Sequence, residues 1–552
     1  MSTASESGSV THEVTNQPPP LEGYNAYDQD RVLVEALHRE GAGWAEDRAR
    51  ALGAIIGSEK LQQLARQANR YAPEIRTHDR FGHRIDSVEY HPAYHELMTL
   101  AFGAEVHALA WTARRSGAHV ARAALSFLWN QGDNGVGCPT GMAFGSAPAL
   151  RQEPDIAAEW EPKVFSAHYD PRPIPLGQKM GATIGETLTE KQAGSDLRAV
   201  TTRALPLGGA GQEFELTGHK WFCSAPMSDA FVTLAQTDKG PTCFLVPRLL
   251  PDGTRNRFFL QRLKDKCGNR SNASAEIEFH RTWARRVGDD GHGIRVVLEM
   301  SHLTRFDFAV GSAAIMRQAL TQALHHTGHR SAFRRPLVDQ PLMRNVLADL
   351  ALESEAATVL VMRLARAYEE SSHDEHERLF ARIATPIAKY WICKRTPGFV
   401  AEALECLGGN GYVEDSLMPR LYREAPLNGI WEGVANMVCL DIFRALLREP
   451  ASLSVFWTHI KEARGTDRRL DAFASRLERE LIDENEHEAR ARRVAEMMAL
   501  ALQGALLVRH SPNAVADAFC TSRLGGDWGA AFGTLPAGLA LDQVIKRAQL
   551  ER

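Results

Sequence analysis

The chain has 552 residues, of which 44% are apolar and 24% charged, and its formal net charge is −4. This length predicts several domains with separate cores, and the charge excludes an overall basic nucleic-acid-binding protein but not a local basic face. No apolar run reaches the roughly 18 residues of a membrane span, and the start of the chain lacks a secretory pattern. The eight cysteines are scattered, without C-x-x-C spacing. We therefore expect a cytoplasmic protein with reduced thiols and no membrane partner.

The hydrophobic period changes twice along the chain. Residues 1–24, rich in Ser, Thr and Pro, predict an extended N-terminal arm, and residues 25–184 carry mostly helical spacing. Residues 185–290 contain short, often alternating segments between Gly-rich turns, which predicts a β-domain. Helical spacing returns over residues 291–447, where the stretches suit a helix bundle, and a further helical domain is expected over residues 448–552.

One candidate binding segment comes at the start of the predicted β-domain. Leu188–Asp196, LTEKQAGSD, combines small residues with hydroxyl side chains. Small residues let backbone N–H groups approach a ring or a pyrophosphate, and hydroxyls give directed hydrogen bonds, although a polar surface turn has the same composition. Gly218–Ser224, GHKWFCS, adds an aromatic pair and a hydroxyl to this region, although such a pair on a strand is most often ordinary core.

A longer pattern covers Glu405–Glu432, ECLGGNGYVEDSLMPRLYREAPLNGIWE. Its glycines alone fit a helix C-cap and turn. Together with the first segment, however, its glycine, aromatic, acidic and basic positions resemble signatures of the acyl-CoA dehydrogenase family, with Ala193 where the flavin loop usually has glycine. The resemblance implies an α+β fold with an N-terminal helical domain, a middle β-barrel or sandwich and a C-terminal four-helix bundle. The last helical domain of this chain is additional to that plan.

The resemblance implies an FAD site on a scaffold other than a Rossmann fold, because the sequence has neither G-x-G-x-x-G after a strand nor a P-loop. Arg330–Pro336, RSAFRRP, resembles a family segment that contacts the FAD of a neighbouring subunit, which implies Arg330 and Phe333 at that contact. Gly408 and Gly409 are implied near the adenosine half. The other implied cofactor-binding residues are Leu188, Thr189, Gly194, Ser195, Phe222, Cys223, Ser224, Ile430, Trp431, Gly433 and Asn436.

The segment Ile430–Gly433, IWEG, resembles the family's I-Y-E-G, whose glutamate removes the α-proton of an acyl thioester. That chemistry needs a carboxylate on one face of the substrate Cα–Cβ bond and the flavin on the other. An isolated glutamate is usually a solvated surface residue, but in this context Glu432 is predicted to be the catalytic base. The stretch Ser301–Arg305 keeps the arginine of a family F-D-x-x-R pattern without its Phe-Asp pair, which questions an ordinary CoA substrate.

Further segments resemble one branch of the family, the adaptive-response proteins of the alkylation response. They are Thr11–Pro18, Arg39–Trp44, Leu263–Ser274 and Leu421–Glu424. This resemblance covers nearly the whole chain and implies an FAD-containing homotetramer (a dimer of dimers) with weak acyl-CoA dehydrogenase activity and non-specific binding of double-stranded DNA. The alternative is an ordinary acyl-CoA dehydrogenase of fatty or branched-chain acid metabolism with no DNA role.

The DNA-binding expectation depends on residues 448–552, which hold 15 Lys and Arg and 15 Asp and Glu. Phosphate contact needs a local basic face, whereas a solvated helix with internal ion pairs would have the same composition. The acidic run Asp483–Glu488 opposes DNA contact. No metal is expected, because no H-E-x-x-H or Cys and His ligand spacing is present. The candidate DNA contacts are Arg468, Arg469, Arg492 and Arg493.

Overall fold

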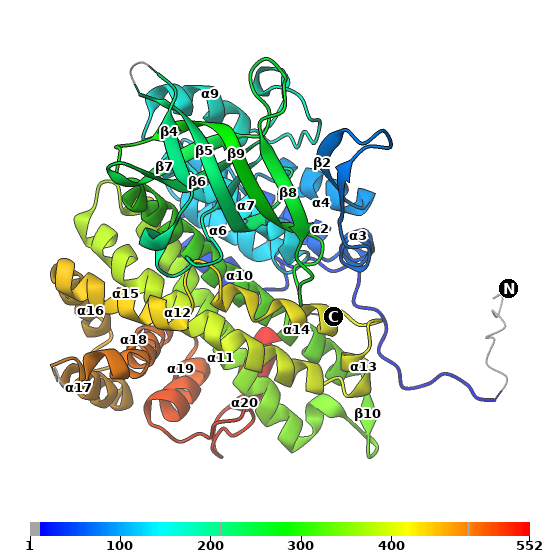
Figure 1. Cartoon of the computed structure of the whole chain (residues 1–552). Coiled ribbons are helices and arrows are strands. Elements are labelled where there is room, and N and C mark those ends of the chain that lie inside the picture. Colours follow the sequence, from blue (N-terminus) through cyan, green and yellow to red (C-terminus); the bar gives the residue numbers. More distant parts are fainter. Residues whose placement is uncertain (1–10, 209–210, 483–485, 552) are drawn as a thin grey trace.

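The computed structural model describes residues 11–208, 211–482 and 486–551. A β-sheet domain lies above a helix bundle, the N-terminal helices lie beside both, and the last helices cover the lower side of the bundle (Figure 1). The described part of the expected arm, residues 11–24, contains neither helix nor strand, as predicted. The arm's first ten residues, the turn at 209–210 and residues 483–485 of the acidic run lie outside the described residues.

The N-terminal region is helical, as its periodicity predicted. Asp30 caps the first helix, because its carboxylate accepts a hydrogen bond from the Leu33 N–H at 3.1 Å. One feature was missed, a hairpin of β1 (Glu74–His78) and β2 (Arg84–Glu89), whose turn is closed by the Asp79 carboxylate. The helices are α1 (Arg31–Arg39), α2 (Glu46–Ile56), α3 (Glu59–Arg70), α4 (Pro92–Gly103), α5 (Leu109–Thr112), α6 (Ala118–Trp129), α7 (Asn134–Gly145), α8 (Ala147–Leu150) and α9 (Pro154–Val164).

The predicted β-domain is a seven-stranded sheet with the order β3-β6-β4-β5-β9-β7, in which β8 also pairs with β9 and β6 also pairs with β7. The extra pairing curls the sheet towards a barrel. Alternating residues of β6 pack into two different cores, because Val232 faces the helices whereas Phe231 packs within the sheet. The strands are β3 (Ile184–Thr187), β4 (Arg203–Pro206), β5 (Glu213–Ser224), β6 (Ala230–Thr237), β7 (Gly240–Pro247), β8 (Phe258–Leu263) and β9 (Ser274–Val287).

The predicted bundle is built on long helices. They are α10 (Gly293–His329), α11 (Pro341–Glu370), α12 (Glu375–Glu405) and α15 (Ala435–Arg448), with a small hairpin of β10 (Ser331–Ala332) and β11 (Arg335–Pro336) after α10 and the short helices α13 (Gly409–Tyr412) and α14 (Met418–Glu424) before α15. With 37 residues, α10 is about 55 Å long. It reaches from the β-domain to the far end of the bundle (Figure 1).

The helices after residue 448 share the apolar core of the bundle. They are α16 (Ala451–Lys461), α17 (Arg468–Ile482), α18 (His487–His510), α19 (Asn513–Phe519) and α20 (Leu541–Ala548). Helix α18 packs on α11, α12 and α15, and α20 packs on α11. Apolar side chains of this region therefore belong to the same buried cluster as those of the bundle. No described helix combines the length and apolar character needed to cross a bilayer.

Candidate active site

Glu432 lies in the short connection that follows a 3-10 turn and precedes α15. Its backbone has φ +55°, a conformation that non-glycine residues rarely adopt and that is concentrated at functional sites. Gly433, with φ +102°, completes this turn. The hydroxyl of Ser301, on α10, donates a hydrogen bond to the Glu432 carboxylate at 2.7 Å. The turn thus directs one carboxylate towards α10.

Two cations hold the backbone around Glu432. The Arg305 guanidinium donates to the Glu432 carbonyl at 2.8 Å, and the Lys389 ammonium donates to the carbonyls of Trp431 and Gly433 at 2.8 and 2.6 Å. Burial lowers the pKa of Lys389 to about 8. These three hydrogen bonds end on main-chain oxygens, so they fix the position of the turn, and the Glu432 carboxylate has no direct ion pair among the described residues.

A second layer of contacts supports this turn. Asp441 on α15 accepts from Arg305 and from Arg382, each at 3.0 Å. Burial alone would raise the pKa of Asp441, but the two guanidinium groups lower it. The Trp431 ring stacks on Phe308 with centroids 4.7 Å apart. The orientation of the glutamate is therefore set by α10, α12 and α15 together.

The segment predicted as the flavin loop is anchored by a buried ion pair that the sequence analysis did not single out. Glu190 and Lys220 are both fully buried and 2.8 Å apart, and Glu190 also accepts from the backbone N–H and the hydroxyl of Thr201 and of Thr202. Burial alone would raise the pKa of Glu190, but Lys220 and these donors lower it to about 2. Ser195 stays exposed at the loop's tip. The loop therefore has a rigid base beneath an accessible rim.

The predicted flavin strand lies beside this loop. The Trp221 N–H donates to the Thr189 carbonyl at 2.7 Å, and the register of β5 against β9 shifts between Lys220 and Cys223. At this irregularity Phe222 is turned outwards and is 49% exposed. Other predicted residues have mixed settings. Leu188 packs on the apolar cluster between the sheet and the helices, and a Cβ on Gly194 would contact the Thr189 side chain. Cys223 is buried, and the Ser224 hydroxyl lies 3.3 Å from that of Ser274.

Strand β3 brings the two sequence segments close together, and we call the region between them the cleft. The Thr187 hydroxyl donates to the Phe222 carbonyl at 3.0 Å, and the adjacent Glu186 lies within reach of the charge of Glu432. Phe222 on β5 and Ile430 beside Glu432 present apolar surface, 49% and 57% exposed. Apolar faces next to hydroxyl and backbone donors fit a flat heteroaromatic ring, so the residues present are suited to a flavin.

Four predicted cofactor residues lie elsewhere. Arg330 ends α10, 25 residues beyond Arg305, which is about 37 Å along the helix. It donates to the Asn16 carbonyl of the N-terminal arm at 2.8 Å, and Phe333 is 96% exposed on the β10–β11 hairpin. Gly408 and Gly409 stand at the start of α13, which packs on α12 and α14. The predicted cofactor residues therefore include a group around Glu432 and a separate group, Arg330 and Phe333, at the far end of α10.

Comparison with known proteins covers three parts of the chain. Residues 16–171 match the adaptive response protein AidB N-terminal domain, residues 185–282 the acyl-CoA dehydrogenase middle domain, and residues 291–447 the acyl-CoA dehydrogenase C-terminal domain. The AidB protein of Escherichia coli (strain K12) is 45% identical over 512 residues, covering 92% of this chain and 94% of that protein. The chain belongs to the acyl-CoA dehydrogenase family, in its AidB branch. It is therefore an FAD-dependent oxidoreductase.

Other acyl-CoA dehydrogenases also match most of the chain. Acyl-CoA dehydrogenase family member 11 of Caenorhabditis elegans is 27% identical over 88% of this chain and 84% of its own length. The structure of C. elegans ACDH-11 in complex with C11-CoA covers 94% of both chains with a TM-score of 0.86 at 24% identity. A Bacillus anthracis acyl-CoA dehydrogenase complexed with FAD covers 96% of this chain and 94% of its own, with a TM-score of 0.69 at 15% identity. At these identities the structures show the fold alone.

Segments that carried the AidB resemblance meet in the structure. The Glu424 carboxylate of the L-Y-R-E segment accepts from the Asn269 N–H at 2.6 Å and from its amide group at 2.9 Å. Gly268 lies against the Arg423 carbonyl, which a Cβ would approach to 2.4 Å. On the same loop, Lys266 donates to the Ser274 hydroxyl at 3.2 Å. This loop thus links α14 to the strand end that carries Ser224.

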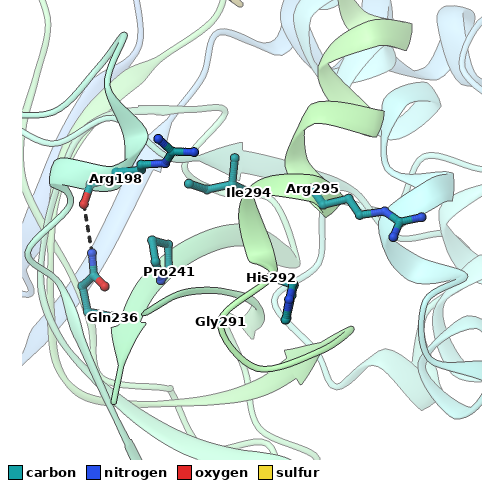
Figure 2. Close-up of a pocket in the computed structure, with 7 residues that line it drawn as sticks. All are labelled: Arg198, Gln236, Pro241, Gly291, His292, Ile294 and Arg295. Atoms are coloured by element: carbon teal, nitrogen blue, oxygen red, sulfur yellow. Dashed lines mark hydrogen bonds between the residues drawn. The ribbon is translucent and has the colours of Figure 1, made fainter. Parts of the chain in front are cut away.

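A surface pocket of about 340 Å³ lies between Arg198, just after the flavin loop, and the N-terminus of α10 (Figure 2). Gln236 donates to the Arg198 carbonyl at 3.1 Å on one wall. Figure 2 shows Arg198 extending towards Ile294, whereas Arg295 points away from both. The pocket does not include Glu432. Along α10, Ser301 is six residues from Arg295, or about 9 Å.

Three of the four predicted DNA contacts are engaged with protein groups. Arg469 pairs with Asp467 and Asp517, and Arg493 pairs with Glu480. Arg492 donates to the Asn436 amide oxygen at 2.8 Å, which joins a predicted DNA residue to a predicted flavin residue. The remaining exposed arginines of α17 lie outside its buried face of Leu470, Phe473 and Leu477, although the Arg476 guanidinium packs over the Phe473 ring. They are Arg468, Arg476 and Arg479, and none has an ion pair among the described residues.

One cluster in the described chain contains side chains of the kinds that bind metal ions. Ligand atoms of His376, Glu377 and His459 lie within 4.8 Å of one another. Arg363, however, donates two hydrogen bonds to Glu377, at 2.9 and 2.7 Å, and faces the His459 ring nitrogen at 3.3 Å. A guanidinium therefore already supplies the positive charge to this group.

Sequence reasoning missed Glu186, Ser301 and Lys389. Lys389 stands in an apolar helical run, TPIAKYWIC, and this setting signals a buried cation with a specific partner. Glu186 likewise interrupts the buried strand ATIGETL. Ser301 carried no comparable signal, because a serine on a long helix is compatible with many environments.

Proposed function

We propose that this protein oxidises an acyl thioester, with Glu432 as the base that takes the α-proton. The observation that carries the proposal is the geometry of the turn: Ser301 orients the carboxylate, while Arg305 and Lys389 fix the backbone on either side. A base held in this way can stand ready beside a substrate carbon without reorganising. FAD, when bound, supplies the hydride acceptor on the opposite face of the substrate.

The remaining residues of the cleft exclude water and set the direction of approach. The stacking of Trp431 on Phe308 holds the segment that carries the base against α10. The apolar surfaces of Phe222 and Ile430 flank the space in front of the base. The pocket beside Arg198 and His292 suits the phosphate-bearing end of a thioester carrier, because the α10 N-terminus and a guanidinium both favour anions. The distance of about 9 Å from Arg295 to Ser301 leaves room for a linking arm.

We further propose a homotetramer, a dimer of dimers, in which each FAD contacts two chains. The separation of about 37 Å between Arg305 and Arg330 supports this assembly, since one flavin cannot use both groups of predicted residues from one chain. Phe333 and Tyr412, 96% and 80% exposed, offer the apolar surface that such a contact would cover.

For the finer role, we propose a cytoplasmic protein of the alkylation response that has weak dehydrogenase activity and binds double-stranded DNA without sequence preference. The AidB relationship supports this role, and residues 448–552 supply the proposed DNA surface. Arg468, Arg476 and Arg479 on α17 are better suited to phosphates than Arg469 or Arg493, whose charges are neutralised by acidic partners.

Two parallel experiments test these roles. Purified protein should bind FAD, and a panel of acyl-CoA thioesters added without oxygen should bleach the flavin slowly, with Glu432→Gln abolishing the bleaching. In the same preparation, duplex DNA should bind in a salt-dependent manner. A protein that cannot be loaded with FAD contradicts the first role. Rapid bleaching with a common acyl-CoA and no DNA binding would favour an ordinary acyl-CoA dehydrogenase.

A further inference from the structure

A second carboxyl group shares the cleft with Glu432. In β3, Ile184 faces the apolar cluster between the sheet and α10, whereas a Cβ on Gly185 would meet the Phe231 ring on the other face. Strand alternation therefore directs Glu186 to the same side as Ile184. On that side lie apolar residues of β6, β7 and α10, namely Val232, Leu234, Cys243, Leu245, Val296, Val297 and Met300. A carboxyl in this layer needs a specific reason to be there.

Among the described residues, Glu186 lacks a positive charge that would balance a negative one. Its Oε1 atom is buried and has no hydrogen-bond partner among the described residues. Its backbone N–H is directed to the Met142 sulfur at 3.3 Å, which ties the strand to α7 but does not serve the side chain. Glu432, by contrast, accepts from Ser301 and has Lys389 nearby. Of the two carboxyls, Glu432 is thus the better site for the negative charge.

The charges around Glu186 favour its protonated form. Burial raises its pKa well above the ordinary value, and the charge of Glu432 raises it further. The other titratable group that it affects is the buried Cys243 thiol of β7, which offers no positive charge. These surroundings therefore favour the neutral carboxylic acid, whose O–H would be a hydrogen-bond donor without an acceptor among the described residues.

We propose that Glu186 is a specificity-determining residue whose protonated carboxyl donates a hydrogen bond to an oxygen or nitrogen acceptor on the substrate, close to the carbon that Glu432 deprotonates. The inference rests on the proposed function, because it assumes that the substrate enters this cleft. A plain hydrocarbon chain would leave a buried O–H unpaired, which disfavours it, whereas an ether, hydroxyl or carbonyl group would satisfy the donor. The favoured substrates are thus oxygen- or nitrogen-bearing thioesters rather than simple fatty acyl groups.

Matched ligands test this selectivity on the FAD-loaded protein. We compare butanoyl-CoA with methoxyacetyl-CoA, and pentanoyl-CoA with 3-methoxypropanoyl-CoA, where an ether oxygen replaces one methylene. Affinities come from the perturbation of flavin absorption. At neutral pH at least one ether ligand should bind about tenfold more tightly than its hydrocarbon counterpart. Glu186→Gln, which keeps a donor, should retain the preference, and Glu186→Leu should lose or reverse it.

The pH dependence provides a second readout. The preference should fall as the pH rises and Glu186 loses its proton, whereas Glu186→Gln should show no such dependence. The proposal would be overturned if the wild type bound the two ligands of each pair equally tightly. An unchanged preference for the ether in Glu186→Leu would also overturn it. So would a Glu186→Leu variant whose only defect is loss of FAD affinity, since the hydrogen bond would then belong to the flavin.

A ligand-free measurement separates this inference from the proposed function. Infrared spectra of the FAD-loaded protein should contain the carbonyl stretch of a protonated carboxylic acid at neutral pH, and Glu186→Gln should remove it. If that band is absent, the inference fails whatever the ligands do. If the band is present but no CoA thioester perturbs the flavin, the acyl-thioester proposal fails and the neutral donor at Glu186 stands.

Discussion

Basic side chains are used differently in the cleft around Glu432 and in the helices after residue 448. In the cleft, Lys389 donates to backbone carbonyls and Arg305 donates to one as well as to Asp441, and these bonds determine where a carboxylate points. In the C-terminal helices, Arg469 pairs with Asp467 at 2.5 Å and Arg493 pairs with Glu480 at 2.9 Å. The first arrangement positions one reactive group, whereas the second removes charge from the surface. A count of arginines therefore overstates the charge that is free to meet phosphate.

The largest expected effect is at the base. Glu432→Gln keeps the shape of the side chain but cannot take a proton, so the rate of dehydrogenation should fall about 10²–10⁴-fold while FAD content stays unchanged. Ser301→Ala, which removes only the orienting hydrogen bond, should lower the rate about 10–100-fold. Stopped-flow bleaching measures both. A Glu432→Gln variant as fast as Ser301→Ala would show that another group is the base.

The buried pair beneath the flavin loop should dominate stability. Lys220→Met leaves the Glu190 charge buried without its partner and should lower the free energy of unfolding by about 3–5 kcal/mol. The matched exposed change, Arg493→Met, should cost less than about 1 kcal/mol. Denaturant unfolding measures both. Similar losses in the two variants would remove the distinction between the buried pair and the C-terminal pairs.

The same pair predicts a pH dependence. The folded pKa of Glu190, about 2, is below its ordinary 4.5, so its stabilising contribution is fully present above pH 4.5. It should be lost as the pH falls from 4.5 towards 2. The difference in unfolding free energy between wild type and Glu190→Gln, measured across the accessible part of this window, should shrink with acidity. A constant difference would mean that folding does not lower the pKa of Glu190.

Substitutions should weaken DNA binding where the arginine lacks an ion pair among the described residues, and should have little effect where it has one. Replacing Arg468, Arg476 and Arg479 by Ala should reduce the slope of log affinity against log salt by about 2.7, or 0.9 for each phosphate contact. Replacing Arg469 and Arg493 should change it little. Fluorescence anisotropy with a short duplex measures the slopes, and the flavin spectrum is the control. Equal slopes in both variants would place the DNA surface elsewhere.

The smallest effect is expected at the contact between α15, which follows Glu432, and α18 of the C-terminal helices. Arg492→Ala removes the hydrogen bond to Asn436 and should lower stability by about 0.5–1.5 kcal/mol. A double-mutant cycle with Asn436→Ala should give a coupling energy of that order. A coupling of zero would show that α18 and α15 are joined by apolar packing alone.

Sequence patterns predicted the elements better than the contacts between them. The β-domain and bundle follow from local periodicity, so both were found, whereas the β1–β2 hairpin was missed because its short, polar strands, EIRTH and RIDSVE, give a weak signal. Glu432 was identified by its motif. Its neighbour Glu186 is 246 residues away, and no local pattern reports that folding brings two carboxyls into one cleft.

The length of α10 has a consequence for how the cofactor is kept. If the two groups of cofactor residues serve different flavins, a lone chain holds only half of each site, and affinity for FAD becomes a property of the assembly. Dilution would then release flavin together with subunits, and added FAD would drive reassembly. Flavin fluorescence against protein concentration would report the oligomeric equilibrium without any label, and Phe333→Ala would shift that curve while leaving Glu432 and its support intact.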